Sequence, residues 1–361
     1  MSSIESYQTR NGRRWRVRYR KPDHSSTSKG GFARRRDAEE WMAGNVQAMS
    51  GGQWVDPRNR RVSVDRVASS WLAAKATASK PSYASTLRIA YNTHVKPVFG
   101  SRRVGDVSRQ EIQEWVNGLA DRRSPSVVRR AAGILRGILQ QAADDRLIAS
   151  SPYKGISLPK VSRSSHRYLT AGQLLTVAHC AGDKEPLVLL LGFTGIRFGE
   201  AAALRVGDVD VARRRVTISK SMTPVDGRMV ETTPKSGKGR VVAYPAYLDS
   251  WMRRLVAGRR ADCLLFSRAD GSPIRSQHSP TSKGSWWHKA CEEAGLPAMR
   301  LHDLRHTAAS LMVAAGANVK VVQRMLGHAS AAMTLDVYAD LFDSDLDEVA
   351  SGMDGLVRSV G

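Results

Sequence analysis

The chain of 361 residues is 42% hydrophobic and carries a formal net charge of +23 at pH 7, with an isoelectric point near 10.5. Its length predicts two or three domains with cores of their own, and its charge points to a polyanionic partner, of which nucleic acid is the commonest. A membrane surface is the alternative, but no apolar run approaches the roughly 18 residues of a spanning helix and the N-terminus lacks an apolar signal segment, so the sequence predicts a cytoplasmic protein without membrane contact.

Residues 1–61 are unusually basic, with 14 Lys or Arg against 6 Asp or Glu. Between positions 14 and 20 charged and apolar residues alternate with the period of a strand. One face of that strand carries Arg14, Arg16, Arg18 and Arg20. The Asn11-Gly12 turn, a strand over 28–33 and a helix over 36–49 complete a predicted three-stranded sheet backed by one helix. Such a sheet can lay its arginine face in a major groove of DNA; a solvated basic face is the alternative.

Residues 62–155 predict a helical domain. Apolar residues recur at helical spacing in four segments: 64–76, 82–95, 108–119 and 126–143. Ser108 and Glu111 fit a capping box. Helix-breaking residues fall between the segments, namely Pro81, Pro97, Gly100 and Pro125. A generic helical domain without a DNA-binding role is the alternative, and a linker is expected over 156–167.

Residues 168–343 form the third predicted domain, which opens with a second capping box at Thr170 and Gln173. Helices are expected as far as residue 204. Three segments alternate like the strands of one small sheet: 214–219, 228–232 and 240–243. Further helices are expected over 246–257, 281–294 and most of 302–341. The predicted fold class is therefore mainly α with small β-sheets (α+β), with a mixed α/β third domain.

Two arginines, two histidines and a tyrosine in the third domain are the parts needed to break a phosphodiester without a metal. They are Arg197, His302, Arg305, His328 and Tyr338. A guanidinium matches two phosphate oxygens with a rigid fork of donors and stays charged. Ionising an ordinary tyrosine at pH 7 costs about 4 kcal/mol, which a histidine base and two cations can offset.

A zinc site is the competing interpretation, because His302 and His306 stand four residues apart on one expected helical face with Arg305. Asp303 follows where metalloproteases carry Glu, no third ligand is evident, and Arg305 lies beside the pair. We therefore expect His306 to pack within its helix. The cysteines, Cys180, Cys263 and Cys291, lack metal-ligand spacing and are expected to be reduced thiols. The sequence predicts no metal and no cofactor.

These residues stand in segments that resemble the signature of the tyrosine recombinases, specifically the phage-type (lambda-like) integrases. The segments are Thr194-Gly195-Ile196-Arg197-Phe198-Gly199-Glu200, His302-Asp303-Leu304-Arg305-His306-Thr307, Leu326-Gly327-His328, and Tyr338 ten residues further on. Each segment alone is a weak signal. All of them in this order, within a three-domain layout, make a specific one.

The resemblance implies a role for each matching residue. Arg197, Arg305 and His328 bind the scissile phosphate and stabilise its transition state. Tyr338 is the nucleophile, and His302 assists proton transfer to or from it. Lys235 lies between two expected strands, where the family keeps its general-acid lysine, and Lys238 competes for that role. Glu200 is expected to be a buried partner that orients the site.

By the same resemblance, the protein is a site-specific recombinase that cuts and rejoins DNA through a 3′-phosphotyrosyl intermediate, without metal or ATP, to integrate or excise a phage or mobile-element genome. Residues 1–61 resemble the arm-type DNA-binding domain, 62–155 the core-binding domain and 168–343 the catalytic domain. The implied partners are double-stranded DNA with core and arm-type sites, three further protomers in a synaptic tetramer, a host DNA-bending protein and a directionality factor.

The tail, residues 344–361, carries an apolar stripe at helical spacing: Leu346, Val349, Met353, Leu356 and Val357. It packs either on its own protomer or, as is common in this family, on a neighbouring one. Three other functions remain as alternatives: a resolvase of chromosome or plasmid dimers, a type IB topoisomerase, and a DNA-binding regulator that has lost catalysis. The basic region 1–61 favours an integrase over a resolvase.

Overall fold

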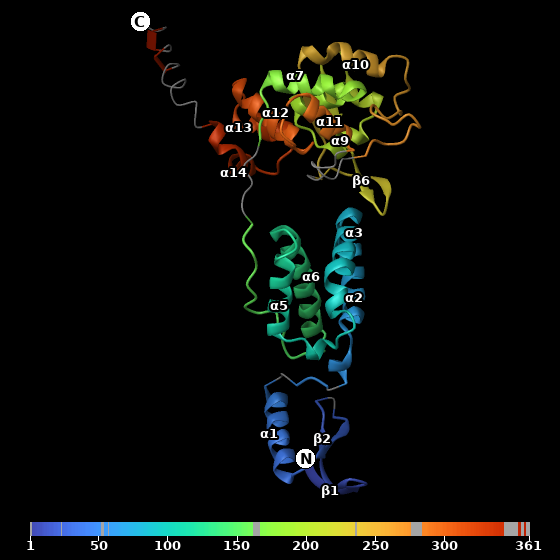
Figure 1. The fold of residues 1–361 in the computed structure, drawn as a ribbon, viewed down its shortest axis with the longest axis vertical. Helices are drawn as coiled ribbons and strands as arrows, with labels where there is room; N and C mark the ends of the chain where they lie inside the picture. The colour runs from blue at the N-terminus through green and yellow to red at the C-terminus, as the bar shows by residue number, and fades with distance from the viewer. Residues whose placement is uncertain are drawn as a thin grey trace. The chain divides into compact units, whose positions relative to one another are not determined.

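The computed structural model describes the chain except residues 1, 23, 52–53, 57, 162–166, 235–236, 276–283, 343–352, 355–356 and 359–361. Lys235 and most of the tail 344–361 therefore lie outside the described residues. The chain divides into two compact units, Met1–Ser162 and Arg163–Gly361 (Figure 1). Among the described residues, no helix has both the length and the apolar character needed to cross a membrane.

The first unit begins with an antiparallel sheet in the order β1-β2-β3, followed by a helix. The elements are β1 (Ser3–Thr9), β2 (Gly12–Arg20), β3 (Ser26–Phe32) and α1 (Arg35–Ser50). Thr9 pairs with Gly12, whose φ of +101° suits the turn between β1 and β2. Val17 and Tyr19 are buried in a small core with Ala38 of α1. The predicted sheet backed by a helix is thus confirmed.

A helical bundle completes the first unit. Its elements are α2 (Val64–Ala78), α3 (Pro81–Ala90), a π-helical turn (Tyr91–Val95), α4 (Lys96–Phe99), α5 (Arg109–Ala120) and α6 (Pro125–Asp144). The capping box of Ser108 and Glu111 is present. Pro97 does not separate two helices as predicted, but lies inside a continuous helical run from 81 to 99. The π-helical turn before it interrupts the regular hydrogen-bond ladder, which accommodates a residue without an N–H.

The second unit starts with three helices, of which the middle one is almost wholly buried. They are α7 (Ala171–Cys180), α8 (Glu185–Thr194) and α9 (Phe198–Ala203). The capping box of Thr170 and Gln173 is confirmed. The later helices are α10 (Asp249–Val256), α11 (Trp286–Glu293), α12 (Asp303–Ala314), α13 (Val319–Leu326) and α14 (Ala331–Phe342). α12 packs along α8, so two segments more than 100 residues apart in sequence lie side by side.

The strands of this unit form two small sheets, not the one predicted. β4 (Val209–Asp210), β5 (Arg215–Ile218) and β8 (Arg240–Ala243) pair in the order β4-β5-β8, whereas β6 (Ser221–Val225) and β7 (Arg228–Thr232) form a separate hairpin. The reason is local: Asp226 and Gly227 both have positive φ, +48° and +80°, which makes a tight hairpin turn that pairs β7 with its immediate predecessor. The sequence analysis did not predict strands β4 and β6.

One predicted helix start is also corrected. The helix expected over 281–294 begins at Trp286, where the Ser285 hydroxyl accepts a hydrogen bond from the His288 amide at 3.1 Å. Helices fill most of 302–341 as predicted; the first begins at Asp303, with His302 as its N-cap residue. Residues 246–248 form a 3₁₀ turn ahead of α10.

Candidate active site

A glycine turn at the end of α8 positions the first arginine. Gly195 ends the helix in the left-handed conformation, with φ +67°, and Arg197 follows as the N-cap residue of α9. The turn is tightly enclosed, because a Cβ on Gly195 would meet Leu326 of α13 and Ala308 of α12. The Thr194 hydroxyl, also buried, donates to the Leu190 carbonyl at 2.5 Å. The backbone before Arg197 is therefore enclosed by α12 and α13 and held by a hydrogen bond within α8.

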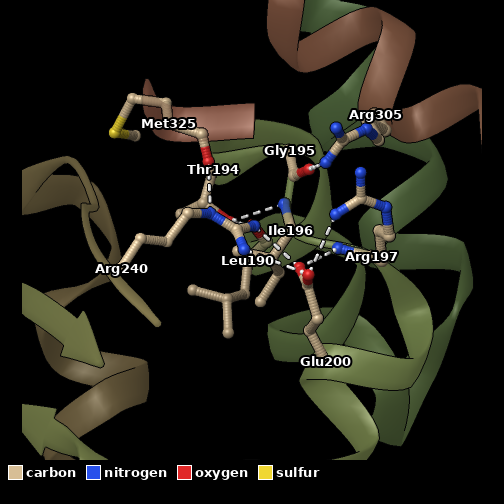
Figure 2. A network of polar contacts seen from close by, with 9 residues as sticks. All are labelled: Leu190, Thr194, Gly195, Ile196, Arg197, Glu200, Arg240, Arg305 and Met325. Atoms are coloured by element: carbon tan, nitrogen blue, oxygen red, sulfur yellow. Dashed lines mark hydrogen bonds and ion pairs between the residues drawn. The ribbon is translucent and has the colours of Figure 1, made fainter. Parts of the chain in front are cut away.

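Glu200 joins two arginines beneath this turn, as Figure 2 shows. Its carboxylate is buried, with 1% of the residue exposed. It accepts from the Arg197 amide at 2.8 Å and from Arg197 Nη1 at 3.0 Å. Both terminal nitrogens of Arg240, on β8, donate hydrogen bonds to the same carboxylate, at 3.0 and 2.7 Å. Its Nε donates to the Met325 carbonyl at 3.0 Å.

The charge of Glu200 is held by these arginines. Burial alone would raise the pKa of this carboxyl, but the hydrogen bonds and charge of Arg240, with those of Arg197, outweigh burial and leave the pKa below its ordinary value. Because both carboxylate oxygens are engaged, Glu200 binds arginines and is no free proton carrier in this arrangement.

Arg305 is the second arginine at the site and is almost wholly buried, at 4% exposure. Its Nη1 donates to the Gly195 carbonyl at 2.6 Å, which places it on the same side as Arg197 in Figure 2. Its Nη2 is buried and has no hydrogen-bond partner among the described residues. Burial first, and then the charge of Arg197, lowers the pKa of Arg305. Two neighbouring cations and an unmatched buried donor favour an anion at this place.

Tyr338 lies on α14 with 1% of its surface exposed, at a point where the helix is kinked by a non-helical φ of −129° and ψ of 15°. Its hydroxyl is 2.9 Å from Nδ1 of His306 on α12. The ring of His328 stacks on it, with centroids 6.3 Å apart and planes 9° from parallel. Burial raises the pKa of Tyr338 to about 12, while the charge of Arg305 acts to lower it.

The pKa values of both predicted site histidines are lowered. Nδ1 of His328 is 3.0 Å from the buried Thr334 hydroxyl, and burial together with Arg305 and Arg197 lowers the pKa of His328 to about 4. Burial, followed by the charge of Arg305, also lowers the pKa of His302. The His302 ring lies edge-on to His306 at 5.7 Å between centroids. No group of three or more metal-ligating side chains occurs among the described residues.

The second unit thus brings together the predicted Arg197, Glu200, His302, Arg305, His328 and Tyr338 through the contacts above. Lys235 lies outside the described residues, and Lys238 is exposed in the segment before β8. Two site residues were missed. Nothing in the pattern of β8 marks Arg240 as a partner of Glu200. His306 was interpreted as a packing residue, although its place next to Arg305 and four residues after His302 put it within reach of the site.

An acidic residue of the neighbouring strand β1 lies beside the arginines of β2. Glu5 of β1 forms ion pairs with Arg16 at 3.2 Å and with Arg18 at 3.3 Å. Arg18 and Arg20 are exposed, whereas Arg14 and Arg16 are half-buried. Arg16 also lies over the ring of Tyr7, 5.6 Å from its centroid. This face is therefore partly neutralised within its own sheet.

Comparisons with known proteins show which family this chain resembles. The profile described as "Phage integrase family" matches residues 173–345, and that described as "Phage integrase central domain" matches 64–157, together about three quarters of the chain. The putative prophage phiRv2 integrase of Mycobacterium tuberculosis is 27% identical over 339 residues, which are 90% of this chain and 88% of the relative.

Two solved structures share the fold. The Tn1549 transposon integrase, in complex with a circular intermediate DNA, has a TM-score of 0.64 at 19% identity and covers 80% of this chain and 99% of its own. The lambda integrase tetramer bound to a Holliday junction has a TM-score of 0.56 at 18% identity, over 90% of this chain and 96% of its own.

Proposed function

Because the chain belongs to the phage integrase family of tyrosine recombinases, we propose that it breaks and rejoins DNA at specific sites through a covalent bond between Tyr338 and a 3′-phosphate. The observation that carries this proposal is the convergence of Tyr338, Arg197 and Arg305 in one unit, with an unmatched guanidinium donor between helices α8 and α12. The biological outcome is the integration or excision of a phage or mobile-element genome in the cytoplasm of a bacterial host.

The phosphate site carries more positive charge than the described carboxylate of Glu200 neutralises. Glu200 is shared between Arg197 and Arg240, so it compensates only part of the local positive charge. A DNA phosphate placed against Arg197 and Arg305 supplies negative charge. One of its oxygens accepts a hydrogen bond from Nη2 of Arg305, which has no partner among the described residues. In the transition state its non-bridging oxygens gain charge, which the fixed guanidiniums stabilise.

The reaction then proceeds in two transesterifications. The Tyr338 oxygen attacks phosphorus, the bond to the 5′-oxygen breaks, and a general acid protonates that oxygen. We assign the acid to Lys235, with Lys238 as the competing residue. His328, neutral and with its ring parallel to that of Tyr338, donates a hydrogen bond to the phosphate, and His302 assists transfer of the proton that Tyr338 loses as it attacks and regains on departure. A 5′-hydroxyl of another strand reverses the step, so bond energy is conserved and ATP is not needed.

The DNA partners follow from the two basic regions. We assign core sites to the helical bundle with the second unit, and arm-type sites to residues 1–61, with Arg14, Arg16, Arg18 and Arg20 on phosphates or base edges. A tetramer at the crossover, a host bending protein and a directionality factor complete the proposed assembly. The described tail residues Met353 and Val357 are 62% and 74% exposed. Their apolar side chains support docking on a neighbouring protomer, which deletion of residues 344–361 tests: synapsis should fall more than binding to one site.

A covalent-adduct assay tests the proposed chemistry directly. Wild-type protein and Tyr338→Phe are incubated with a nicked duplex that carries the attachment core flanking the integrated element, in EDTA, and run on denaturing gels. An adduct with wild type alone supports the nucleophile and the metal-independent chemistry. An adduct with Tyr338→Phe places the nucleophile elsewhere. Tight binding to a verified site without any adduct favours the non-catalytic regulator, and recombination of the element's own ends separates an integrase from a dimer resolvase.

A further inference from the structure

The hydroxyl of the proposed nucleophile already has a hydrogen-bond partner, and it is not one of the two histidines that the motifs single out. Tyr338 Oη lies 2.9 Å from Nδ1 of His306. Both side chains are buried, with 1% and 8% of the residues exposed. The two rings are held by separate helices, α14 and α12, which pack against each other. The contact is therefore built into the fold of the second unit.

The other two histidines are placed for different tasks. Nδ1 of His328 is engaged by the Thr334 hydroxyl, and its ring lies parallel to that of Tyr338, with centroids 6.3 Å apart and no hydrogen bond to the hydroxyl among the described contacts. His302 lies edge-on to His306 and likewise makes no described hydrogen bond to Tyr338. Of the three rings, that of His306 is the one with a hydrogen bond to the reacting oxygen among the described contacts.

We infer that His306 is a further catalytic residue, which accepts the proton of Tyr338 as the hydroxyl attacks the phosphate; the inference rests on the proposed function. In the forward step the O–H bond of Tyr338 breaks, its proton passes to Nδ1 of His306, and the new O–P bond forms. The P–O5′ bond breaks, and the 5′-oxygen takes a proton from the cationic general acid. In the reverse step His306 returns the proton to the departing Tyr338 oxygen.

The surroundings of Tyr338 make a proton acceptor necessary. Burial raises the pKa of Tyr338 to about 12, so only about one molecule in 100,000 is ionised at pH 7. Attack by a phenolate formed in advance is correspondingly rare. Transfer of the proton within an existing 2.9 Å hydrogen bond, as the O–P bond forms, avoids that unfavourable ionisation.

The test must separate proton acceptance from mere positioning of the ring. Asn places an amide oxygen close to the position of Nδ1, so His306→Asn keeps an acceptor for the Tyr338 hydroxyl but cannot take its proton. We expect cleavage of the nicked duplex to slow by about 100-fold or more, with DNA binding and melting temperature unchanged. If this variant does not fold, His306→Gln serves instead; its longer side chain places the amide nearer the Nε2 position, and it too cannot take the proton of Tyr338.

Replacing Tyr338 with the more acidic 3,5-difluorotyrosine provides the decisive second measurement, since a nucleophile that ionises more readily depends less on a base. The ratio of the cleavage rates of the proteins with His306 and with Asn at this position should then fall at least tenfold. A gap of equal size with both tyrosines makes His306 a positioning residue and overturns the inference. Cleavage by His306→Asn at the wild-type rate overturns it as well. If 3,5-difluorotyrosine restores the cleavage rate of His302→Asn but not that of His306→Asn, the proton acceptor is His302 instead.

Failure of this inference is distinguishable from failure of the proposed function. Wild type that forms no adduct, or Tyr338→Phe that does, contradicts the proposed function itself. A normal wild-type adduct that needs Tyr338, together with an unimpaired His306→Asn variant, removes only the role of His306.

Discussion

Arg240 binds both carboxylate oxygens of Glu200, and this pair is the most deeply buried ion pair described at the site, with side-chain exposures of 10% and 0%. The same guanidinium donates to the Met325 carbonyl at the end of α13. One side chain thus connects β8, α9 and α13. Removal of one partner from a buried pair leaves an uncompensated charge, which typically costs about 3–5 kcal/mol.

Arg240→Met should therefore lower the free energy of unfolding by about 3–5 kcal/mol, measured by urea titration monitored by circular dichroism. A double variant, Glu200→Gln with Arg240→Met, should recover part of the loss because the carboxylate that Arg240 compensated is then neutral. Arg260→Met is the control, since Arg260 and Asp262 form a pair with exposures of 83% and 63% and its loss should matter little. Equal effects of Arg240→Met and Arg260→Met would contradict the burial argument.

Glu200 should also contribute to unfolding in acid. Its folded-state pKa lies below the ordinary value of 4.5, so its contribution to stability is present above that value and is lost as the pH falls through the folded-state pKa. Wild type should lose stability below about pH 4.5 more steeply than Glu200→Gln. Urea titrations from pH 7 to pH 3 measure the two slopes. Parallel curves would show that other carboxylates dominate the acid transition.

His328 should remain neutral at pH values where an ordinary histidine is charged. Its pKa is lowered to about 4, so its ring should keep the neutral ¹⁵N chemical shifts down to pH 5, with His328→Asn identifying the signal. The unfolded state takes up this proton near pH 6.5, so folding stability is complete above that pH and declines toward pH 4. His328→Asn should flatten the decline. A ring that titrates near pH 6.5 in the folded protein contradicts this prediction.

Gly195→Ala should damage both the fold and the reaction. A Cβ there would lie 2.4 Å from Leu326 Cδ2 and 3.2 Å from Ala308 Cβ, on a backbone with φ +67°. Overpacking typically costs about 1–3 kcal/mol, and the shifted carbonyl of Gly195 no longer holds Arg305. Gly182→Ala isolates the backbone term, because φ is +59° there with nothing within 4 Å of the Cβ. Gly195→Ala should lose more stability and more cleavage activity than Gly182→Ala, as measured by urea titration and cleavage rates. Similar losses in both variants would show that only the positive φ matters.

The acidic residue on the arginine face offers a test of the arm-type role. Glu5→Gln frees Arg16 and Arg18 from their ion pairs and removes a negative charge that repels phosphate. Affinity of the full-length protein for arm-type duplex should rise, with a steeper dependence on salt. Glu40→Gln, which breaks the exposed pair with Arg36 on α1, makes the same charge change elsewhere. Fluorescence anisotropy at several salt concentrations compares them, and identical shifts would count against binding by β2.

The sequence predicted which residues lie together around Tyr338 better than it predicted the strands beside them. Arg197, Arg305, His328 and Tyr338 stand in short segments whose residue types are fixed by chemistry, so their resemblance to a family is visible without coordinates. Arg240 and Glu200 lie 40 residues apart in sequence, and no local periodicity encodes their contact. The separation of β6 and β7 from the other strands depends on backbone angles at Asp226 and Gly227, where two short strands of similar pattern admit either pairing.

His306 shows a different limit of pattern reading. Its helical position was predicted, but the partner of its Nδ1 depends on where α14 returns, 32 residues later, and on the kink at Tyr338. Spacing along one helix indicates which residues share a face. It does not indicate which residue of a distant helix that face meets.

The position of Arg240 at the start of β8 has a consequence for how such an enzyme can change over evolution. The segment before it carries Lys235 and Lys238, and Arg240 itself is fixed to Glu200 and to the backbone three residues before His328. Any shift of Arg240 is therefore felt by two other elements, α9 and α13. Variation for new DNA targets should therefore spare Arg240 and its two partners, the Glu200 carboxylate and the Met325 carbonyl.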